Sequence, residues 1–334
     1  MNRILISGGA GFIGANLVKL LLEWEPEWKI VVADALTYAG DKKRLEEISD
    51  NPRFSFYQVD ITQKEKMREI WEREKPQGVI HLAAESHVDR SIKDPSPFIL
   101  TNVLGTEVLL ELSLEFGVSR FLHVSTDEVY GELKDKEGKF TEEHPLAPSS
   151  PYSASKAGGE LLVKAYERTF NLPVVIVRPS NNYGPWQYPE KLIPVVIWQA
   201  LHHQPVPVYG RGENWREWLY VEDCAQGIYT AFLKGREGEI YNLGSGEERQ
   251  NLDTVKTILS LLGEKEDLIQ FVPDRPGHDF RYSLDSQKAE RELNWRAKTK
   301  FAEGIKKTVD WYIKNIKWVE EKIKERDFSQ KSYE

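Results

Sequence analysis

A run of glycines behind a short apolar stretch limits the possible folds more than any other feature of this sequence. Arg3–Ser7 (RILIS) is typical of a buried β-strand, and Gly8–Gly14 (GGAGFIG) follows it and opens an amphipathic helix. Glycine lets a backbone approach a pyrophosphate with no Cβ in the way, and the N-terminus of a helix attracts that charge. The pattern therefore predicts the first βαβ unit of a dinucleotide-binding Rossmann fold.

The first half of the chain alternates between short apolar segments and amphipathic segments, which predicts a parallel sheet covered by helices on both faces. The predicted strands are Arg3–Ser7, Ile30–Ala33, Phe54–Val59, Gly78–Leu82, Arg120–Val124 and Val174–Arg178. The predicted helices are Phe12–Glu23, Lys42–Ile48, Gln63–Glu74, Pro97–Phe116 and Ser153–Phe170. The fold class is α/β, with a doubly wound parallel-sheet Rossmann domain and a smaller α/β substrate-binding domain.

Proline and tryptophan become more frequent after Pro179, which predicts a domain boundary. We expect the dinucleotide-binding domain over residues 1–180, with chain re-entry around 212–240. The smaller domain is expected over 181–211 and 241–315, followed by a charged C-terminal helix or tail over 316–334.

Composition and charge exclude several classes of protein. The 334 residues carry a net charge of −8, which argues against a nucleic-acid partner. The single cysteine, Cys224, excludes an internal disulfide, and the N-terminus does not resemble a signal peptide, so we expect a cytoplasmic protein. No apolar run approaches the roughly 18 residues of a membrane span, so no membrane partner is expected.

Two acidic residues behind predicted strands extend the dinucleotide site. Asp34 ends the second strand 20 residues after Gly14, where a carboxylate accepts hydrogen bonds from a ribose 2′-hydroxyl and repels a 2′-phosphate. The predicted cofactor is therefore NAD rather than NADP. Asp60 and Ile61 follow the third strand and could flank the adenine, although Asp60 or Thr62 could equally cap the next helix.

Tyr152 and Lys156 lie four residues apart, on one face of a predicted helix. A nearby ammonium stabilises phenolate, so Lys156 should lower the pKa of Tyr152 and allow it to act as a base. Thr126, at the end of the fifth strand, offers a hydroxyl for a substrate oxygen. The alternative is an ordinary surface pair on a helix.

Asp127 and Glu128 are adjacent carboxyls at the end of an apolar strand. Crowding raises the pKa of one carboxyl while the other ionises, which provides an acid and a base together. The alternative is a pair of capping acids, and the spacing does not assign the two roles.

Long ordered motifs show a resemblance to a known family. They are LTYAG (36–40), HLAAESHVDRSI (81–92), STDEVYG (125–131), PYSASKA (151–157), SNNYGP (180–185), EKLIP (190–194), PVYG (207–210), WLYVED (218–223) and DRPGHDFRY (274–282). With them the chain resembles the extended short-chain dehydrogenase/reductase superfamily, and within it the nucleoside-diphosphate-sugar 4,6-dehydratases, above all those that act on dTDP-glucose. The resemblance implies a homodimer and a smaller domain that binds the sugar nucleotide.

The resemblance also implies an internal redox reaction. Tyr152 would take the proton of the sugar 4-hydroxyl while a hydride leaves C4 for NAD. Glu128 would then remove the C5 proton and Asp127 would protonate the departing 6-hydroxyl. The hydride would return to C6, giving a 4-keto-6-deoxy sugar.

The family's ligand contacts map onto named positions of this chain. The implied catalytic residues are Thr126, Asp127, Glu128, Tyr152 and Lys156. The implied cofactor contacts are Gly8, Gly11, Phe12, Ile13, Gly14, Asp34, Ala35, Leu36, Thr37, Asp60, Ile61, Leu82, Ala83, Ala84, Glu85, Ser86, Thr101, Tyr152, Lys156 and Asn182. The implied substrate contacts are Ser86, Thr126, Asn181, Lys191, Leu192, Pro207, Val208, Tyr209, Arg216, Asn251, Asp274, Arg275, Pro276, Gly277 and His278.

Several alternatives stay open at this point. Arg216 and Arg275 are the best candidates for a diphosphate clamp, since guanidinium matches phosphate oxygens, but either could form a surface salt bridge. His81 and His87 do not have the spacing of a metal site, and none is expected. Rival functions are a nucleotide-sugar 4-epimerase or decarboxylase, a dehydratase for UDP-, CDP- or GDP-sugars, or a non-catalytic NAD-binding regulator.

Overall fold

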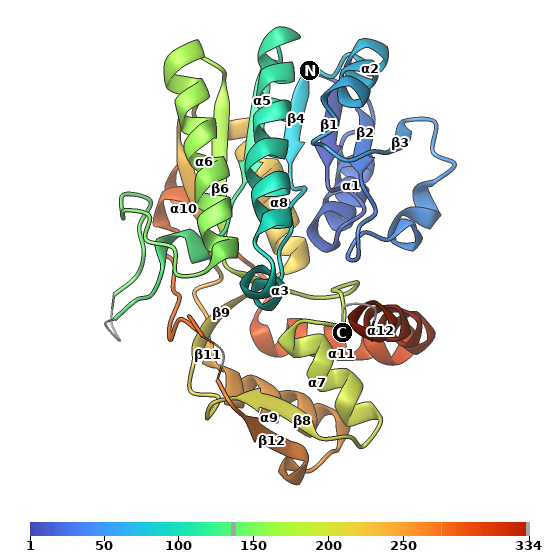
Figure 1. The fold of residues 1–334 in the computed structure, drawn as a ribbon, viewed down its shortest axis with the longest axis vertical. Helices are drawn as coiled ribbons and strands as arrows, with labels where there is room; N and C mark the ends of the chain where they lie inside the picture. Colours follow the sequence, from blue (N-terminus) through green and yellow to red (C-terminus); the bar gives the residue numbers. More distant parts are fainter. Residues whose placement is uncertain (135–137, 275, 332–334) are drawn as a thin grey trace.

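Among residues 1–134, 138–274 and 276–331, which the computed structural model describes, seven parallel strands form the larger sheet (Figure 1). They are β1 (Arg3–Ser7), β2 (Lys29–Asp34), β3 (Phe54–Gln58), β4 (Gly78–His81), β5 (Arg120–Val124), β6 (Val174–Pro179) and β10 (Ile240–Leu243). Their spatial order is β10-β6-β5-β4-β1-β2-β3, so β1 lies between β4 and β2. The predicted α/β fold class is confirmed.

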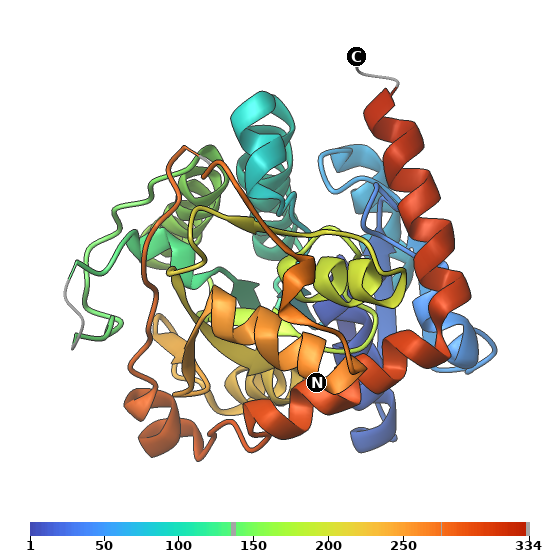
Figure 2. The same cartoon turned by 90° about the horizontal axis from the view of Figure 1, so that it is seen from below.

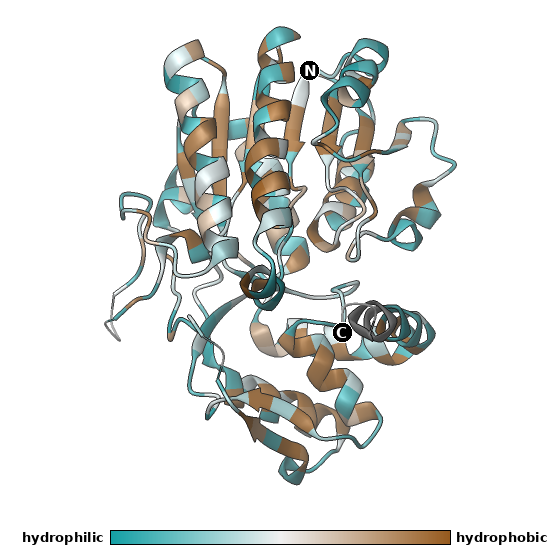
Figure 3. Ribbon diagram, in the orientation of Figure 1, coloured by the Kyte–Doolittle hydropathy of each residue, from teal (hydrophilic) through white to brown (hydrophobic). Residues whose placement is uncertain are grey.

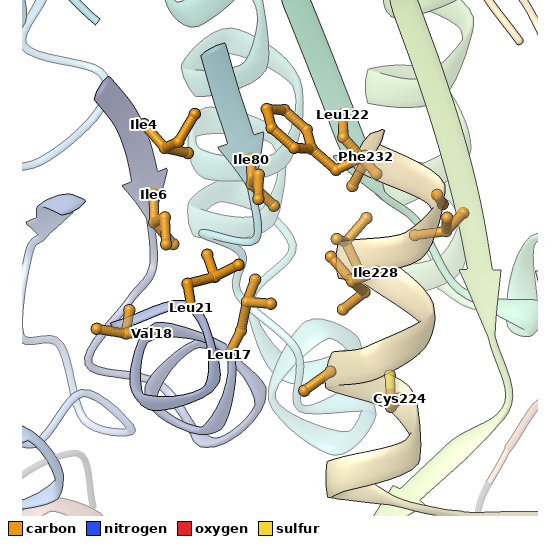
Figure 4. Close-up of a cluster of buried hydrophobic side chains, with 14 of the residues drawn as sticks. Ile4, Ile6, Leu17, Val18, Leu21, Ile80, Leu122, Cys224, Ile228 and Phe232 are labelled. Carbon is orange, nitrogen blue, oxygen red and sulfur yellow. The ribbon is translucent and has the colours of Figure 1, made fainter. Parts of the chain in front are cut away.

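The sheet is buried on both faces because successive residues of each strand point to opposite sides. Ile4 and Ile6 pack with helices α1 (Phe12–Trp24) and α8 (Val221–Lys234), as Figure 4 shows. Leu5 packs on the opposite face with α2 (Lys64–Glu74), α5 (Thr106–Glu115) and α6 (Pro151–Phe170). Continuous apolar strands are therefore the sequence pattern that this two-sided burial requires.

The segment predicted as one helix over Pro97–Phe116 has three parts. These are α4 (Ser96–Ile99), the π-helical turn η2 (Leu100–Gly105) and α5. By length and apolar composition Ser96–Glu115 could cross a membrane, so the expectation that no run approaches that length was wrong. Half of its most apolar stretch is buried within the protein, as in a core helix.

A second lobe lies beyond the carboxyl ends of the strands (Figure 1). It contains the three-stranded sheet β11-β9-β7 and the two-stranded sheet β12-β8. Its elements are β7 (Asn181–Tyr183), α7 (Leu192–Leu201), β8 (Val206–Tyr209), β9 (Trp215–Tyr220), β11 (Glu248–Gln250), α9 (Asn251–Leu262), η4 (Glu266–Leu268), β12 (Ile269–Val272), α11 (Phe301–Lys314) and α12 (Ile316–Lys331). Helix α10 (Gln287–Leu293) packs against α8 and β10 in the first lobe. In Figure 3 α7 is largely hydrophobic and α2 largely hydrophilic, because α7 is buried between neighbours and α2 covers an outer face.

The chain returns to the larger sheet through α8 and β10. Strand β10 pairs in parallel with β6 and all four of its residues are buried. The segment expected to return to the first domain, around residues 212–240, therefore extends to Leu243 at the end of β10. The functional division into two domains stays a prediction.

The C-terminal helix α12 lies beside α11 at the level of the second lobe (Figure 1), and Figure 2 shows it along the side of the molecule. Its Trp318 Nε1 donates a 2.7 Å hydrogen bond to Asp41 Oδ2, and Lys322 Nζ lies 3.2 Å from the same oxygen. Asp41 begins the 3-10 helix η1 (Lys42–Ile48). The charged tail expected from residue 316 is thus helical as far as Lys331, and it joins the two lobes.

Candidate active site

The predicted site residues come from segments that follow neighbouring strands of one sheet. The glycine turn follows β1, Asp34 ends β2, Leu82 follows β4 and Thr126 follows β5. In a parallel sheet these carboxyl ends lie along one edge, where ligands of doubly wound folds bind. The edge faces the second lobe (Figure 1).

The glycine turn is packed too closely for side chains. Gly8 has φ +74°, and a Cβ there would lie 2.6 Å from the nitrogen of Ala83. A Cβ on Gly14 would lie 2.2 Å from the carbonyl oxygen of Gly8. Helix α1 begins at Phe12 with no side chain capping its N-terminus and no acidic residue in its first turn. The uncapped amides and the helix dipole leave a cradle that fits a pyrophosphate.

Asp34 holds the glycine turn from the side. Its Oδ2 accepts a 2.8 Å hydrogen bond from the nitrogen of Ala10, and its Oδ1 accepts one of 2.8 Å from Leu36. Burial raises the pKa of this carboxyl, and the two backbone bonds oppose the shift. The contact to a ribose hydroxyl stays a prediction.

Asp60 and Ile61 have structural roles of their own. Asp60 Oδ1 accepts 2.8 Å bonds from the nitrogen and the hydroxyl of Thr62 in the turn before α2, whose N-terminus at Gln63 has no side-chain cap, so the capping alternative was wrong. The side chain of Ile61 is buried in the core. A cofactor contact at Ile61 would have to come from its backbone.

Asn102, in the π-helical turn η2, was missed by the sequence reasoning. Its side chain accepts a 2.9 Å bond from the nitrogen of Glu85 and donates 3.0 Å to the oxygen of Glu85. It also donates 2.8 Å to the hydroxyl of Ser155, the residue before Lys156. Asn102 thus ties the predicted cofactor loop to the Tyr152 helix, and it lies next to the predicted contact Thr101. A polar side chain inside an apolar helical run was the pattern that could have revealed it.

The short helix η3 (Asp127–Tyr130) carries the two adjacent carboxyls. Thr126 caps it by accepting from the nitrogen of Glu128 at 3.3 Å, and its hydroxyl donates 3.1 Å to Asp127 Oδ1. Asp127 is 1% exposed, and its Oδ2 has no hydrogen-bond partner among the described residues. Burial raises the pKa of Asp127 well above its usual range, and the charges of Glu128 and Glu217 add to the shift.

Tyr152 and Lys156 lie buried on the first turns of α6, which Ser150 and Ser153 open with a reciprocal capping box. The prediction that Lys156 lowers the pKa of Tyr152 was wrong for this structure. Burial raises the pKa of Tyr152 and the charge of Glu128 adds to it, while the Thr126 hydroxyl opposes the shift. Lys156 Nζ instead donates 2.8 Å to the oxygen of Val124, and burial lowers its pKa to about 8.

Two buried histidines lie at the end of strands β4 and β5, near Lys156. His81 bonds Ser7 Oγ through Nδ1 at 2.7 Å and Thr106 Oγ1 through Nε2 at 2.9 Å, so both its nitrogens have protein partners. The ring of His123 lies 5.1 Å from that of His81, and neither of its nitrogens has a partner among the described residues. Burial lowers the pKa of both histidines well below the usual value, and the charge of Lys156 adds to this.

Second-lobe residues bring polar atoms to the same edge. Lys191 Nζ donates a 2.8 Å bond to the oxygen of Ser86 across the two lobes. The side-chain oxygens of Asn181, Asn182 and Asn251 are buried and lack partners among the described residues. Buried polar atoms are normally paired, so these oxygens suit a bound ligand.

The predicted diphosphate clamp is only partly described. The guanidinium of Arg216 donates to the carbonyl oxygens of Trp215 at 2.7 Å and Asp279 at 3.0 Å, and lies over the ring of Tyr282. Its contact to a phosphate therefore stays a prediction. Arg275 lies outside the described residues.

The predicted nucleotide contacts of the second lobe form one surface cluster. His278 Nδ1 lies 2.6 Å from Asp274 Oδ1, and the ring of Tyr209 packs edge-on against His278. Strand β8 alternates, so Tyr209 and Pro207 point outward while Val208 is buried in the core. Val208 could contact a ligand only through its backbone.

Comparison with known proteins identifies the family of this chain. The chain matches the family described as GDP-mannose 4,6 dehydratase over residues 5–308. It is 47% identical to dTDP-glucose 4,6-dehydratase 1 of Escherichia coli strain K12, over 95% of this chain and 94% of that one. The crystal structure of DesIV, a dTDP-glucose 4,6-dehydratase from Streptomyces venezuelae with NAD bound, superimposes with a TM-score of 0.93 at 45% identity, covering 96% and 99% of the two chains.

A solved UDP-glucose 4-epimerase shares the same fold at lower identity. The enzyme from Thermotoga maritima superimposes with a TM-score of 0.87 at 31% identity, over 94% of this chain and 99% of that one. The fold and the identities together place this protein among nucleotide-sugar-modifying enzymes. The chain belongs to the GDP-mannose 4,6 dehydratase family.

Proposed function

We propose that the chain converts dTDP-glucose to dTDP-4-keto-6-deoxyglucose with loss of water, with NAD as a bound cofactor. The observation that carries the proposal is the pair Asp127 and Glu128 at the end of β5, close to Tyr152. A 4-epimerase needs no acid and base for water loss, whereas a dehydratase needs both. The relatives named above support the choice of dTDP-glucose and of NAD.

The cofactor site fits a dinucleotide on structural grounds. The glycine turn leaves no room for a Cβ, the first turn of α1 is uncapped, and Asp34 closes one side. When bound, NAD supplies a hydride acceptor that later returns the hydride to the sugar. The start of α1 would hold the phosphates, and Tyr152 and Asn182 would hold the nicotinamide end.

Tyr152 is the proposed base for the sugar 4-hydroxyl, and the Thr126 hydroxyl holds the same oxygen. Their proximity is supported by the influence of the Thr126 hydroxyl on the pKa of Tyr152. Burial raises the pKa of Tyr152 and so favours the protonated phenol in the free chain, and the phenol has to lose that proton before it can act as the base. Lys156, with a pKa of about 8, is suited to exchange a proton near neutral pH.

Water loss from C5 and C6 assigns the two carboxyls different roles. Burial raises the pKa of Asp127 well above its usual range, which favours the protonated carboxyl, and Asp127 is the proposed acid for the 6-hydroxyl. Glu128 is less buried and is the proposed base for the C5 proton. The carboxyl roles implied by the family resemblance are therefore supported by burial.

The proposal includes a homodimer in the cytoplasm. Ile99, Leu100 and Leu104 on the α4–η2–α5 segment and Leu161 on α6 are exposed apolar residues, each more than 40% accessible. Segments η2 and α5 pack beside α6, so these residues lie on adjacent helices. A second copy of the chain would cover this face by pairing helices across a two-fold axis.

Incubation of the purified protein with dTDP-glucose tests the function. We expect a 4-keto-6-deoxy product, seen as the loss of 18 mass units, and slower or no turnover of UDP-, CDP- and GDP-glucose. A 4-epimerase would instead yield a sugar of unchanged mass. No dehydrated product with any of the four substrates would refute the proposal.

A further inference from the structure

The side chains of Tyr38 and Arg90 lie against each other. The guanidinium of Arg90 lies 3.7 Å from the centre of the ring of Tyr38. Tyr38 belongs to the segment after β2, and Arg90 to α3 (Val88–Lys93) after β4. Because β1 lies between β2 and β4, this contact joins the two flanking segments across the end of β1, where the glycine turn begins.

The second lobe supports this contact from the other side. Glu190 Oε2 lies 4.0 Å from Arg90 Nε and 3.7 Å from His87 Nε2, and its side chain is only 6% exposed. The ring of Tyr188 packs edge-on against Tyr38 at 5.6 Å. A buried carboxylate is stabilised by nearby cations, so the charge of Glu190 favours the position of Arg90 beside the aromatic ring.

We propose that Tyr38, Arg90 and Glu190 form a cofactor strap, which retains the dinucleotide in its groove between turnovers. None of the three is among the cofactor contacts predicted from the sequence. The strap spans the groove at the level of the pyrophosphate, and the dinucleotide leaves only when the Arg90–Tyr38 contact opens. The identity of the dinucleotide as NAD rests on the proposed function.

The proposed chemistry explains why such a strap is compatible with turnover. An enzyme that regenerates its cofactor within each cycle gains nothing from releasing it, whereas an ordinary dehydrogenase must exchange it every time.

The strap is tested by the rate at which bound NAD exchanges with deuterated NAD in solution, followed by mass spectrometry without any sugar nucleotide. Arg90→Met and Tyr38→Leu each remove the cation–π contact and should raise this exchange rate about tenfold. The double variant should exchange no faster than either single variant, because both remove the same contact.

Two variants control the test. Tyr38→Phe keeps the aromatic ring and should exchange at the unmodified rate. Arg73→Met removes an exposed guanidinium that lies over the Tyr57 ring elsewhere on the first lobe, and it should also change nothing. Unmodified exchange in both Arg90→Met and Tyr38→Leu would overturn the strap, as would rate increases that multiply in the double variant.

The exchange rate is independent of dehydratase turnover. If dTDP-glucose is not dehydrated but the two variants still lose NAD faster, the strap stands and the proposed function fails. If the substrate is dehydrated and the exchange rates are unchanged, the function stands and the strap fails.

Discussion

Asp127→Asn is the change that separates the dehydratase from its oxidoreductase relatives. Asparagine has the shape of aspartate and can still accept the Thr126 hydroxyl bond, so η3 should keep its position. The amide cannot donate an acidic proton to the departing 6-hydroxyl. We therefore expect oxidation at C4 to continue while water loss fails.

The structure determines how large the effect should be. A positioned general acid contributes about 10²- to 10⁴-fold to a rate. Asp127 is 1% exposed, so no bulk water can take over as the proton donor. The loss should accordingly lie in the upper half of this range, at least about 10³-fold, or about 4 kcal/mol in the barrier to water loss.

Single-turnover absorbance at 340 nm provides the assay. Asp127→Asn mixed with dTDP-glucose should accumulate reduced cofactor and release no dehydrated product, and Glu128→Gln should do the same. Tyr152→Phe is the contrasting variant, because it should accumulate no reduced cofactor at all. Turnover of Asp127→Asn within tenfold of the unmodified enzyme would show that another group supplies the proton.

Three further changes test the electrostatics and the assembly. Lys156→Met should raise the free energy of unfolding at pH 7 by on the order of 3 kcal/mol. Burial lowers the pKa of Lys156 from its usual 10.5 to about 8, so below pH 8 the folded chain carries a buried charge that destabilises it. The gain should shrink as the pH rises from about 8 to about 10.5, and urea unfolding with an equal gain at pH 7 and pH 10 would contradict it. Arg178→Met leaves Glu160 as an unpaired buried carboxylate and should cost about 3–5 kcal/mol in urea unfolding, whereas a loss below about 1 kcal/mol would mean that water reaches the site. Leu104→Glu should convert the dimer to a monomer, as measured by light scattering. Leu261→Glu, at a similarly exposed position on α9, should leave the dimer intact. A monomeric unmodified chain would refute the dimer.

The elements of the larger sheet could be predicted because burial on both faces demands long apolar runs. Each strand predicted in the first half of the chain is found within a residue or two of its expected bounds. The contacts of the π-helical turn η2 could not be predicted, because the side chain of its Asn102 bonds Glu85 and Ser155, which are 17 and 53 residues away. Helical periodicity carries no information about such distant partners.

The residue types of the candidate site could be predicted, but not their electrostatics. The spacing of Tyr152 and Lys156 shows that they share a helix face, yet it does not show where the ammonium points. In the structure the ammonium bonds the carbonyl of Val124, and burial controls the pKa of the phenol. Asp127 and Glu128 are neighbours in the sequence, and only the fold shows that Asp127 is the more deeply buried.

The pair of buried imidazoles near Lys156 has a consequence for how the enzyme responds to its surroundings. Histidine is the side chain that ordinarily changes charge between pH 5 and 8. Burial lowers the pKa of His81 and His123 well below the usual value, so mild acidification charges these two rings less readily than exposed ones. The charge of the interior on that side of the sheet is therefore less sensitive to pH than the charge of a surface that carries exposed histidines.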